Sequence, residues 1–275
     1  MDLMNLFECE NLRGDGLLFL SISEKAGKNG YYFYNNIFNK LGVHGIYLNC
    51  PTSTLDGIRE TFSFLKIHGA SIAAPFKQVI FSFLDDMTEV ARRTRSVNSV
   101  KQEDGVLVGH NTDEAGLRRV LTNYLPENSR PEVLIYGSGG VVPSVVSAIR
   151  DISPGANISL SGRNRLQRKE ICETLDLDCI DRTDLRFVDL WINATPASIE
   201  NPETIVDLSS NAKIVFDLIP VQGSYPFEKM ILERGQLMIR GFDLYREQFI
   251  EQFHFFLGYD LERALFDELA KRRVL

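Results

Sequence analysis

"VLIYGSGGVVPSVV", residues 133–146, places a glycine-rich turn between an apolar run and a helical pattern. The run has the length of a buried strand, and Gly139 would let a phosphate group approach the backbone closely. The helix that follows would offer its N-terminal amides and its dipole to that anion. The turn therefore predicts a nucleotide site in a Rossmann-type domain, with these cofactor-binding residues: Gly137, Ser138, Gly139, Gly140 and Val141.

Strand and helix patterns alternate on both sides of this turn. Apolar runs of about six residues followed by helical patterns of about ten or more are typical of βαβ units. Downstream, we expect strands at 157–163, 188–194 and 214–219, and helices at 142–151, 165–175 and 227–235. Upstream, we expect strands at 16–22, 45–50 and 70–75, and helices at 31–42, 55–69 and 76–87. Gly42 and Gly69 are placed to cap two of these helices.

Two polar segments organise the rest of the chain. "KQEDGVLVGH", residues 101–110, predicts a hairpin with Asp-Gly at its turn. "PENSRP", residues 126–131, is bounded by prolines, and we place the domain boundary at or just before it. The sequence predicts an α/β fold with two domains, and the last 35 residues or so form one or two helices. These domains are an N-terminal substrate domain with a mainly parallel sheet, 1–118 plus 240–275, and a Rossmann-type domain, 119–239.

Composition limits the kinds of partner. The chain has 275 residues and a net charge of -7, with a pI near 5.3, which argues against a nucleic-acid partner. Its N-terminus, "MDLMNLFECENLRGDG", lacks the basic and apolar regions of a signal peptide, and no segment reaches the apolar length of a membrane span. We expect a cytoplasmic monomer or homodimer that binds a small molecule, with no membrane partner.

The cysteines and histidines predict neither disulfides nor a metal site. Four cysteines are scattered with no C-x-x-C pair: Cys9, Cys50, Cys172 and Cys179. Four histidines form no metal-binding motif: His44, His68, His110 and His254. We therefore expect reduced thiols and no metal.

Lys77 stands in an otherwise uncharged stretch, "SIAAPFKQVIF", residues 71–81. Lysine is rarely buried, so it is either a snorkelling surface residue or an acid or base placed for a reaction. Two turns could supply polar groups around it: "VNSV" with Asn98, and "GHNTDEAG" with Asn111, Thr112 and Asp113. Such residues are also common caps. In an open α/β sheet, however, turns of this kind lie at the carboxyl edge, where ligands bind.

Basic residues follow the second strand of the Rossmann-type domain. "ISLSGRNRLQRKE", residues 158–170, has arginines where an acidic residue would bind the ribose hydroxyls of NAD. Guanidinium groups pair well with phosphate, so NADP is favoured, with NAD as the second candidate. The predicted contacts are Arg163, Asn164 and Arg168; Arg165 lies among them. The alternative is an exposed basic helix start.

Six motifs in order resemble the shikimate dehydrogenase family through most of the chain. They are "APFK", "VNSV", "GHNTDEAG", "GSGG" after a strand, "INATP" and "GFDLYREQ". That family shows T-x-P-x-K, V-N-T, N-T-D-x-x-G, G-A-G-G, N-A-T and a late glutamine. The resemblance implies an NADP-binding second domain and hydride transfer to or from a shikimate-like cyclic hydroxy or keto acid, in quinate or shikimate metabolism or aromatic amino acid biosynthesis.

Site residues carry over from the resemblance position by position. Lys77 and Asp113 correspond to the paired acid and base, and Asn98 and Gln248 to residues that hydrogen-bond the substrate. The cofactor-binding residues extend to Ala194, Thr195 and Gly241. A lysine at this place can stabilise and protonate the alkoxide that forms when a ketone accepts a hydride, and a nearby aspartate can orient the ammonium.

Several positions depart from the family. Its serine pair, which holds the substrate carboxylate, falls near residues 21–35, where Ser21 or Ser23 supplies one hydroxyl and Gly30 stands at the second position. Tyr34 stands where the family often has histidine, so it is a substrate contact or, like Phe33, a core residue. Three further departures are Ala73 for a threonine, Pro220 for a tyrosine and Asp243 for a glycine. Each lost hydroxyl removes a hydrogen bond of about 1.5 to 3 kcal/mol to a charged group.

These departures leave three functions to weigh. The leading one is an NADP-dependent oxidoreductase of the divergent shikimate dehydrogenase-like branch, with an altered carboxylate-binding site. The second is a ligand-binding or regulatory protein that kept the fold and lost efficient turnover. The third, a dehydrogenase of a folate one-carbon unit, fits "NTDEAG" and "VNSV" less well.

Overall fold

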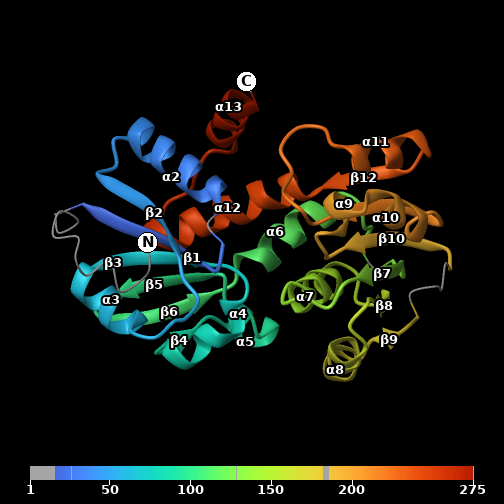
Figure 1. The fold of residues 1–275 in the computed structure, drawn as a ribbon, viewed down its shortest axis with the longest axis horizontal. Coiled ribbons are helices and arrows are strands. Elements are labelled where there is room, and N and C mark those ends of the chain that lie inside the picture. Colours follow the sequence, from blue (N-terminus) through green and yellow to red (C-terminus); the bar gives the residue numbers. More distant parts are fainter. Residues whose placement is uncertain (1–15, 26, 128, 182–185, 275) are drawn as a thin grey trace. The chain divides into compact units, whose positions relative to one another are not determined.

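The chain folds into two compact units in a computed structural model that describes residues 16–25, 27–127, 129–181 and 186–274 (Figure 1). Unit 1 holds the described residues up to Thr112 together with Ile250–Arg273, and unit 2 holds Asp113–Phe249. The unit boundaries fall within α6 (Thr112–Leu121) and α12 (Gly241–Leu257). Each unit has its own six-stranded sheet. The predicted α/β fold is confirmed, whereas the N-terminal stretch with Cys9 lies outside the described residues.

The sheet of unit 1 is mainly parallel and includes one hairpin. Its strand order is β2-β1-β3-β5-β6-β4. The strands are β1 (Leu17–Ser23), β2 (Gly45–Pro51), β3 (Ile67–Ile72), β4 (Asp86–Met87), β5 (Ser99–Glu103) and β6 (Val106–His110). β1 runs parallel to β2 and β3, while β5 is antiparallel to β3 and β6. The predicted Asp-Gly hairpin is confirmed, with φ values of 48° at Asp104 and 83° at Gly105.

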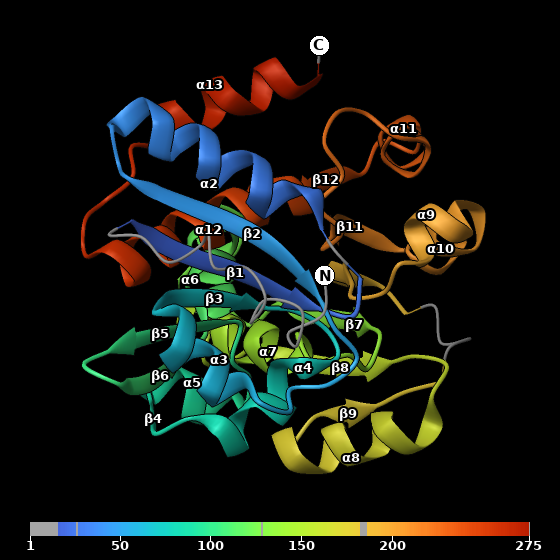
Figure 2. The ribbon, with the colours of Figure 1, turned by 60° about the vertical axis from the view of Figure 1, so that its left-hand side comes forward.

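Side chains alternate between the two faces of this sheet, as the period of a strand requires. Leu18, Leu20 and Ile22 face a core shared with α3 (Ile58–Leu65), α4 (Phe76–Val79) and α5 (Glu89–Thr94). Phe19 faces the other way, with ring contacts to Tyr34 of α2 (Lys28–Leu41) and Phe256 of α12. Figure 2 shows α2 and α13 (Arg263–Val274) on one side of the sheet and α3 and α5 on the other.

Two expectations for this unit are wrong. Gly69 does not cap a helix: α3 ends at Leu65, Lys66 takes the left-handed conformation with φ 51°, and Gly69 pairs with β1 and β5. A Cβ on Gly69 would lie 3.0 Å from the Phe256 ring, so the glycine makes room for that aromatic side chain. The helix expected over 76–87 is instead α4, a 3-10 turn (Ile80–Phe83) and the short strand β4.

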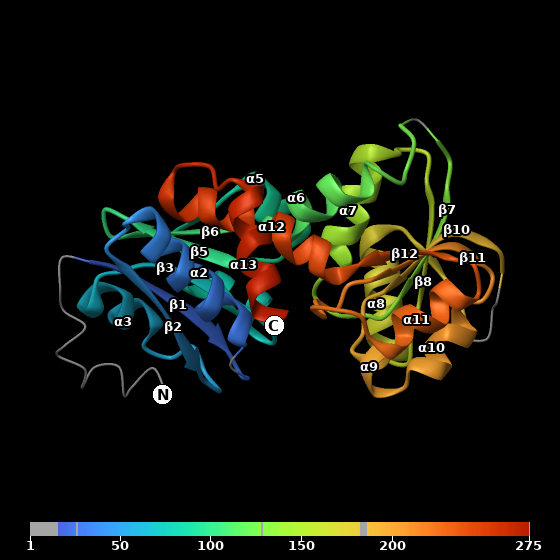
Figure 3. The same ribbon diagram turned by 90° about the horizontal axis from the view of Figure 1, so that it is seen from above.

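Unit 2 is a doubly wound parallel sheet. Its order is β12-β11-β10-β7-β8-β9, formed by β7 (Glu132–Tyr136), β8 (Asn157–Ser161), β9 (Asp178–Cys179), β10 (Val188–Asn193), β11 (Ala212–Asp217) and β12 (Leu237–Arg240). Figure 3 shows α7 (Val142–Ile152) and α8 (Arg165–Leu175) on one face and α9 (Ala197–Glu200), α10 (Pro202–Leu208) and α11 (Pro226–Glu233) on the other. Strand order reverses between β7 and β10, and ligands of such sheets bind at that switch point.

The C-terminal region of the described chain is helical, as expected, and consists of α12 and α13. Among the helices of the described residues, none combines the length and the apolar character that crossing a membrane requires.

Gly241, where β12 passes into α12, has no room for a side chain. A Cβ there would lie 2.5 Å from the carbonyl carbons of Leu218 and Ile219. Because backbone must move to admit it, we expect Gly241→Ala to lower the free energy of unfolding by about 1–3 kcal/mol in urea titrations. Gly139→Ala is the matched control: the described residues place no atom within 4 Å of its Cβ position, so its change should stay within about 0.5 kcal/mol. Equal losses in the two variants would contradict this explanation.

Candidate active site

A row of polar side chains crosses the sheet of unit 1 near its carboxyl edge. Strand register pairs Ser21 with Asn49 on one side and with Ser71 on the other, and Ser71 with Ser99. Residues paired in register point to the same face of a sheet. The row therefore lies on the face of Phe19 rather than that of the Leu18 core.

Lys77 is anchored beside the segment that carries Asn98. Its α4 follows β3 directly, and Phe76 is buried at 4% exposure while Lys77 is half-buried. The Lys77 carbonyl accepts a 2.9 Å hydrogen bond from the Val97 N–H. The Ile72 N–H donates to the Asn98 carbonyl at 2.8 Å, so the end of β3 and Lys77 are both hydrogen-bonded to the residues just before β5.

Asn98 ties this segment to the start of α6. Its Oδ1 accepts from the Thr112 N–H at 2.9 Å, and its Nδ2 donates to Thr112 Oγ1 at 2.9 Å. Asn111 donates from its side chain to Thr94 Oγ1 at 2.7 Å. Asp113 is the next residue after Thr112, in the first turn of α6, and is 3% exposed. Asn98 and Thr112 thus form a buried hydrogen-bonded pair, and the predicted residues Asn111 and Asp113 flank Thr112 in sequence.

The predicted hydroxyl groups have different surroundings. Ser21 is half-buried and hydrogen-bonds Tyr47, whereas the Ser23 hydroxyl donates to the Lys25 carbonyl at 2.7 Å. Tyr34 has 0% exposure, and its hydroxyl donates to Gln252 Oε1 at 3.1 Å. The core alternative therefore describes Tyr34 as well as Phe33.

Sequence reasoning missed Tyr47, Ser71 and Gln252. The Tyr47 ring stacks on Tyr34 with centroids 4.5 Å apart, and burial raises its pKa to about 12 against the lowering by hydrogen bonds with Ser71 and Ser21. Gln252 Oε1 accepts from Ser71 at 2.7 Å, and its Nε2 donates to Ser99 Oγ at 2.7 Å. The available sequence signal was Ser71, a polar residue between the apolar residues Ala70 and Ile72.

Gln248, the glutamine that was expected, belongs to unit 2. It is half-buried on α12, and a Cβ on Gly116 would lie 2.9 Å from its backbone nitrogen. Gly116 thus allows α6 and α12 to approach closely within this unit.

The glycine-rich turn of unit 2 lies at the switch point. The Gly137 N–H donates to the Ser161 carbonyl at 2.8 Å, and a Cβ on Gly137, whose φ is 128°, would lie 2.8 Å from the Ala194 carbonyl oxygen. Gly139 and Gly140 are exposed, and the described residues leave the space above both glycines open within 4 Å. Val141 precedes α7, whose first residue, Val142, is fully buried in the core. A phosphate could therefore reach backbone amides here without meeting a side chain.

Ala194 and Thr195 follow β10 beside this turn. Asn193 donates to the Thr195 carbonyl at 3.0 Å and to Asp217 Oδ1 at 2.9 Å, and Thr195 Oγ1 donates back to Asn193 Oδ1 at 2.7 Å. The Tyr225 hydroxyl donates to Asp217 Oδ2 at 2.6 Å. Burial raises the pKa of Asp217, although these hydrogen bonds oppose the rise. Asp217 and Tyr225 were not predicted. They stabilise the turn after β10 through the hydrogen bond between Asn193 and Asp217.

The three residues expected to bind a 2′-phosphate do not share one environment. Arg163 is exposed, and Asn164 caps α8 by accepting from the Gln167 N–H at 3.2 Å. Arg168 is only 8% exposed, and its guanidinium donates to the Gly162 carbonyl at 3.0 Å. Its Nη2 lies 3.6 Å from Asp181 Oδ1, so the guanidinium contacts a backbone carbonyl and a carboxylate. Ser138 donates to Gln167 Oε1 at 3.1 Å, which joins the glycine-rich turn to α8.

The departures from the family lie in both units. Ala73 is half-buried and its N–H donates to the Ile22 carbonyl at 2.9 Å. Asp243 pairs with Arg246 at 3.4 Å on α12, while Pro220 is exposed. A Cβ on Gly30 would lie 2.9 Å from the Tyr47 hydroxyl oxygen, so Tyr47 fills the space of a side chain at that position.

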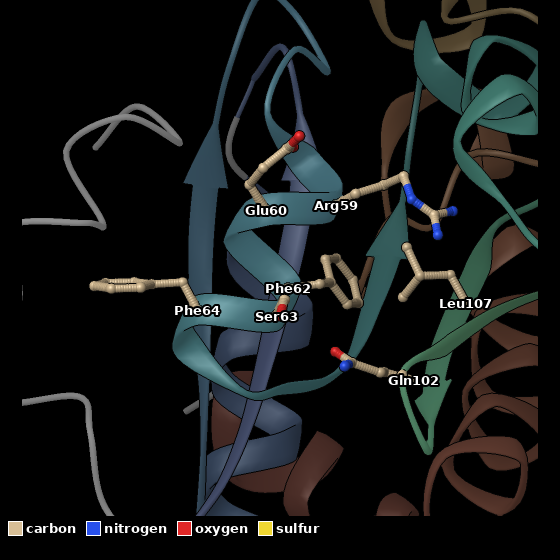
Figure 4. A pocket seen from close by; sticks show the side chains of 8 residues that line it. Arg59, Glu60, Phe62, Ser63, Phe64, Gln102 and Leu107 are labelled. Atoms are coloured by element: carbon tan, nitrogen blue, oxygen red, sulfur yellow. The ribbon is translucent and has the colours of Figure 1, made fainter.

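A separate pocket of about 530 Å³ lies in unit 1 beside α3 and the β5–β6 hairpin (Figure 4). Phe62, Leu107 and Gln102 surround it, while Phe64 points away. Arg59 is held by both carboxylate oxygens of Asp85, at 2.8 and 3.1 Å. The Arg59 guanidinium is therefore already paired, and none of the predicted site residues lines this pocket. For these two reasons we do not assign the active site to it.

Known proteins resemble this chain both in one segment of unit 1 and over most of its length. A model of the shikimate dehydrogenase substrate binding domain matches residues 31–100. A shikimate dehydrogenase-like protein of Haemophilus influenzae is 26% identical over 248 residues, which cover 88% of this chain and 91% of that protein. The shikimate dehydrogenase (NADP(+)) of Aquifex aeolicus is 26% identical over 233 residues, which cover 82% and 85%. The chain is thus similar to shikimate dehydrogenases and to a shikimate dehydrogenase-like protein over most of its length.

Solved shikimate dehydrogenases share the fold. That of Thermus thermophilus, in complex with NADP(H) and shikimate, has a TM-score of 0.79 at 21% identity, covering 93% of this chain and 99% of the other. Within the described residues, no group of three histidine, cysteine or acidic side chains could hold a metal ion.

His110 makes the stability of unit 1 sensitive to acid. Its Nδ1 lies 2.8 Å from Thr88 Oγ1, its Nε2 lies 4.0 Å from Glu251 Oε1, and its ring lies 4.8 Å from that of Phe255. Burial lowers the pKa of His110, and the charge of Glu251 only partly offsets this. The folded chain therefore binds fewer protons than the unfolded chain just below pH of about 6.5, so stability falls as pH drops through that range.

We expect the urea midpoint to fall less between pH of about 7.5 and 5.5 in His110→Gln than in the unsubstituted protein. His44→Gln, at an exposed histidine, is the control and should keep the original slope. If the urea midpoint of His110→Gln fell with pH as steeply as that of the unsubstituted protein, His110 would not be a source of the acid sensitivity.

Proposed function

We propose that the chain is an NADP-dependent oxidoreductase that transfers a hydride between NADP(H) and a shikimate-like cyclic hydroxy or keto acid. The observation that carries this proposal is the hydrogen-bonded turn around Asn98, which joins the Lys77 segment to the residues just before Asp113. These bonds fix the backbone of Lys77, whose side chain is half-buried. The family relatives named above, two of them NADP-dependent or NADP-bound by name, support the same reaction class.

Lys77 and Asp113 are the acid and base in this proposal. In the reducing direction the Lys77 ammonium donates its proton to the oxygen that was the ketone, as negative charge develops there. In the oxidising direction the neutral amine takes the hydroxyl proton. The Asp113 carboxylate orients the ammonium and stabilises its charge. Asn98 and Gln248 hydrogen-bond substrate hydroxyls, which fixes the reacting carbon.

The glycine-rich turn fits a dinucleotide. Its open space over Gly139 and Gly140 would accept a pyrophosphate on backbone amides, and the close approach of Gly137 to Ala194 leaves a glycine as the residue that fits there. Arg163 is exposed at the end of β8 and would pair with a 2′-phosphate. The remaining contacts come from Ser138, Val141, Asn164, Ala194, Thr195 and Gly241. When bound, NADP(H) supplies or accepts the hydride.

The carboxylate-binding site differs from that of the family in this proposal. Gly30 offers no hydroxyl, and the space of its missing side chain is taken by Tyr47. Ser21 is half-buried at the end of β1 and remains the serine that could meet a ligand, since the Ser23 hydroxyl is engaged by Lys25. We therefore expect the preferred substrate to be a relative of shikimate rather than shikimate itself.

Lys77→Ala tests the acid and base assignment. Loss of the proton donor should lower kcat by about 10²- to 10⁴-fold on any substrate of the unsubstituted protein. NADPH affinity, followed by fluorescence titration, should stay within about threefold, because the nucleotide turn belongs to unit 2. Lys271→Ala, at an exposed position of α13, is the control and should keep full turnover. Normal turnover in Lys77→Ala would reject the assignment.

Arg163→Ala tests the cofactor preference. Removing one charge-assisted contact to a phosphate costs about 1.5 to 3 kcal/mol, so NADP affinity should fall about 10- to 150-fold. NAD affinity should change little, since NAD lacks that phosphate. Lys169→Ala removes another exposed cation from α8 and should affect neither cofactor. Equal losses for NAD and NADP would exclude the 2′-phosphate role.

A further inference from the structure

A chain of hydrogen bonds in unit 1 runs in one direction toward Asn98. The Tyr47 hydroxyl donates to Ser71 Oγ at 2.7 Å, and the Ser71 hydroxyl donates to Gln252 Oε1 at 2.7 Å. Gln252 Nε2 then donates to Ser99 Oγ at 2.7 Å, and the Ser99 hydroxyl donates to Asn98 Oδ1 at 2.8 Å. Gln252 is the central link, because its carbonyl oxygen accepts at one end and its NH₂ donates at the other.

Burial makes this chain costly to break. Tyr47 is 1% exposed, Ser99 0%, Asn98 4% and Gln252 7%. Hydrogen bonds in such an interior are stronger than in water, and a donor or acceptor left without its partner pays its desolvation. Each group in the chain is therefore held in one orientation.

The direction of the chain follows from Gln252. Since Gln252 Nε2 donates to Ser99 Oγ, the Ser99 proton points away from Gln252 and toward Asn98 Oδ1. Asn98 Oδ1 also accepts from the Thr112 N–H. Turning the Asn98 amide over would place its NH₂ against two donors.

We propose that Gln252 is a positioning residue that acts through Ser99 to fix the Asn98 amide. With Oδ1 used as an acceptor inside the chain, Nδ2 is fixed as the donor end of the Asn98 amide. One of its bonds goes to Thr112 Oγ1 at 2.9 Å, and in this proposal the same NH₂ group also donates to an oxygen of the substrate. This inference rests on the proposed function for the claim that Asn98 meets the substrate. It differs from the glutamine role carried over for Gln248, which lies one helical turn earlier on α12 and in unit 2.

The first test measures the Asn98 side-chain amide directly and needs no substrate. Its ¹⁵N–¹H cross-peaks are assigned in the full-length protein by their absence from Asn98→Ala. Gln252→Met fills similar volume without the two hydrogen bonds, and Ser99→Ala removes the next link. Both variants should shift the Asn98 cross-peaks. Tyr34→Phe is the matched control, because it removes a different bond to Gln252 Oε1 and leaves the Ser99 link intact.

The second test uses shikimate as the probe in calorimetric titrations. Gln252→Met and Ser99→Ala should each weaken shikimate binding about tenfold, whereas Tyr34→Phe and the NADP affinity of every variant should stay within about twofold. Unmoved Asn98 cross-peaks in folded Gln252→Met and Ser99→Ala would overturn the proposal. So would shifted cross-peaks with unchanged shikimate affinity. If the unsubstituted protein binds neither shikimate nor NADP, the proposed function fails, and the cross-peaks still decide whether Gln252 positions Asn98.

Discussion

The paired hydrogen bonds between Asn98 and Thr112 are the constraint on which unit 1 depends. They hold the start of β5 to the end of β6, at 2.9 Å for both the backbone and the side-chain contact. The Ile72 N–H joins the end of β3 to the same residue by donating to the Asn98 carbonyl at 2.8 Å. Lys77 is joined to this turn through Val97, and Asp113 follows it in sequence. A turn held this firmly can keep an acid and a base at fixed places, which proton transfer to a particular oxygen requires.

In unit 2, the turns at the switch point are also held in place by close packing and buried hydrogen bonds. Gly137 lies so close to Ala194 that the two turns after β7 and β10 form one backbone surface. The buried cluster of Asn193, Asp217 and Tyr225 supports that surface from below. Rigid backbone beneath an open glycine turn suits a pyrophosphate, because the amides are already directed before the ligand arrives.

Much of this arrangement could be predicted from the sequence, because motifs at strand ends follow from chain order alone. The glycine-rich turn, the Asp-Gly hairpin and the residues 111–113 were found in this way. Gln252 was not, because its role depends on strand register, which sets Ser71 beside Ser99, and on the face of α12 that covers them. The surroundings of Arg168 could not be predicted for a related reason: its sequence position resembles that of Arg163, and only the fold shows that its guanidinium donates to the Gly162 carbonyl and lies near Asp181. Gly69 looked like a helix cap because the sequence does not show that the strand begins before it.

The central claim is that this chain carries out NADP-dependent hydride transfer. The most direct measurement follows nicotinamide absorbance in the purified full-length protein with NADP⁺ and a panel of shikimate, quinate and related cyclic hydroxy acids. We expect reduction of NADP⁺ that depends on at least one member of the panel. Tight binding of NADP⁺ with no reduction by any member would contradict it and would favour a protein that binds its ligands without converting them.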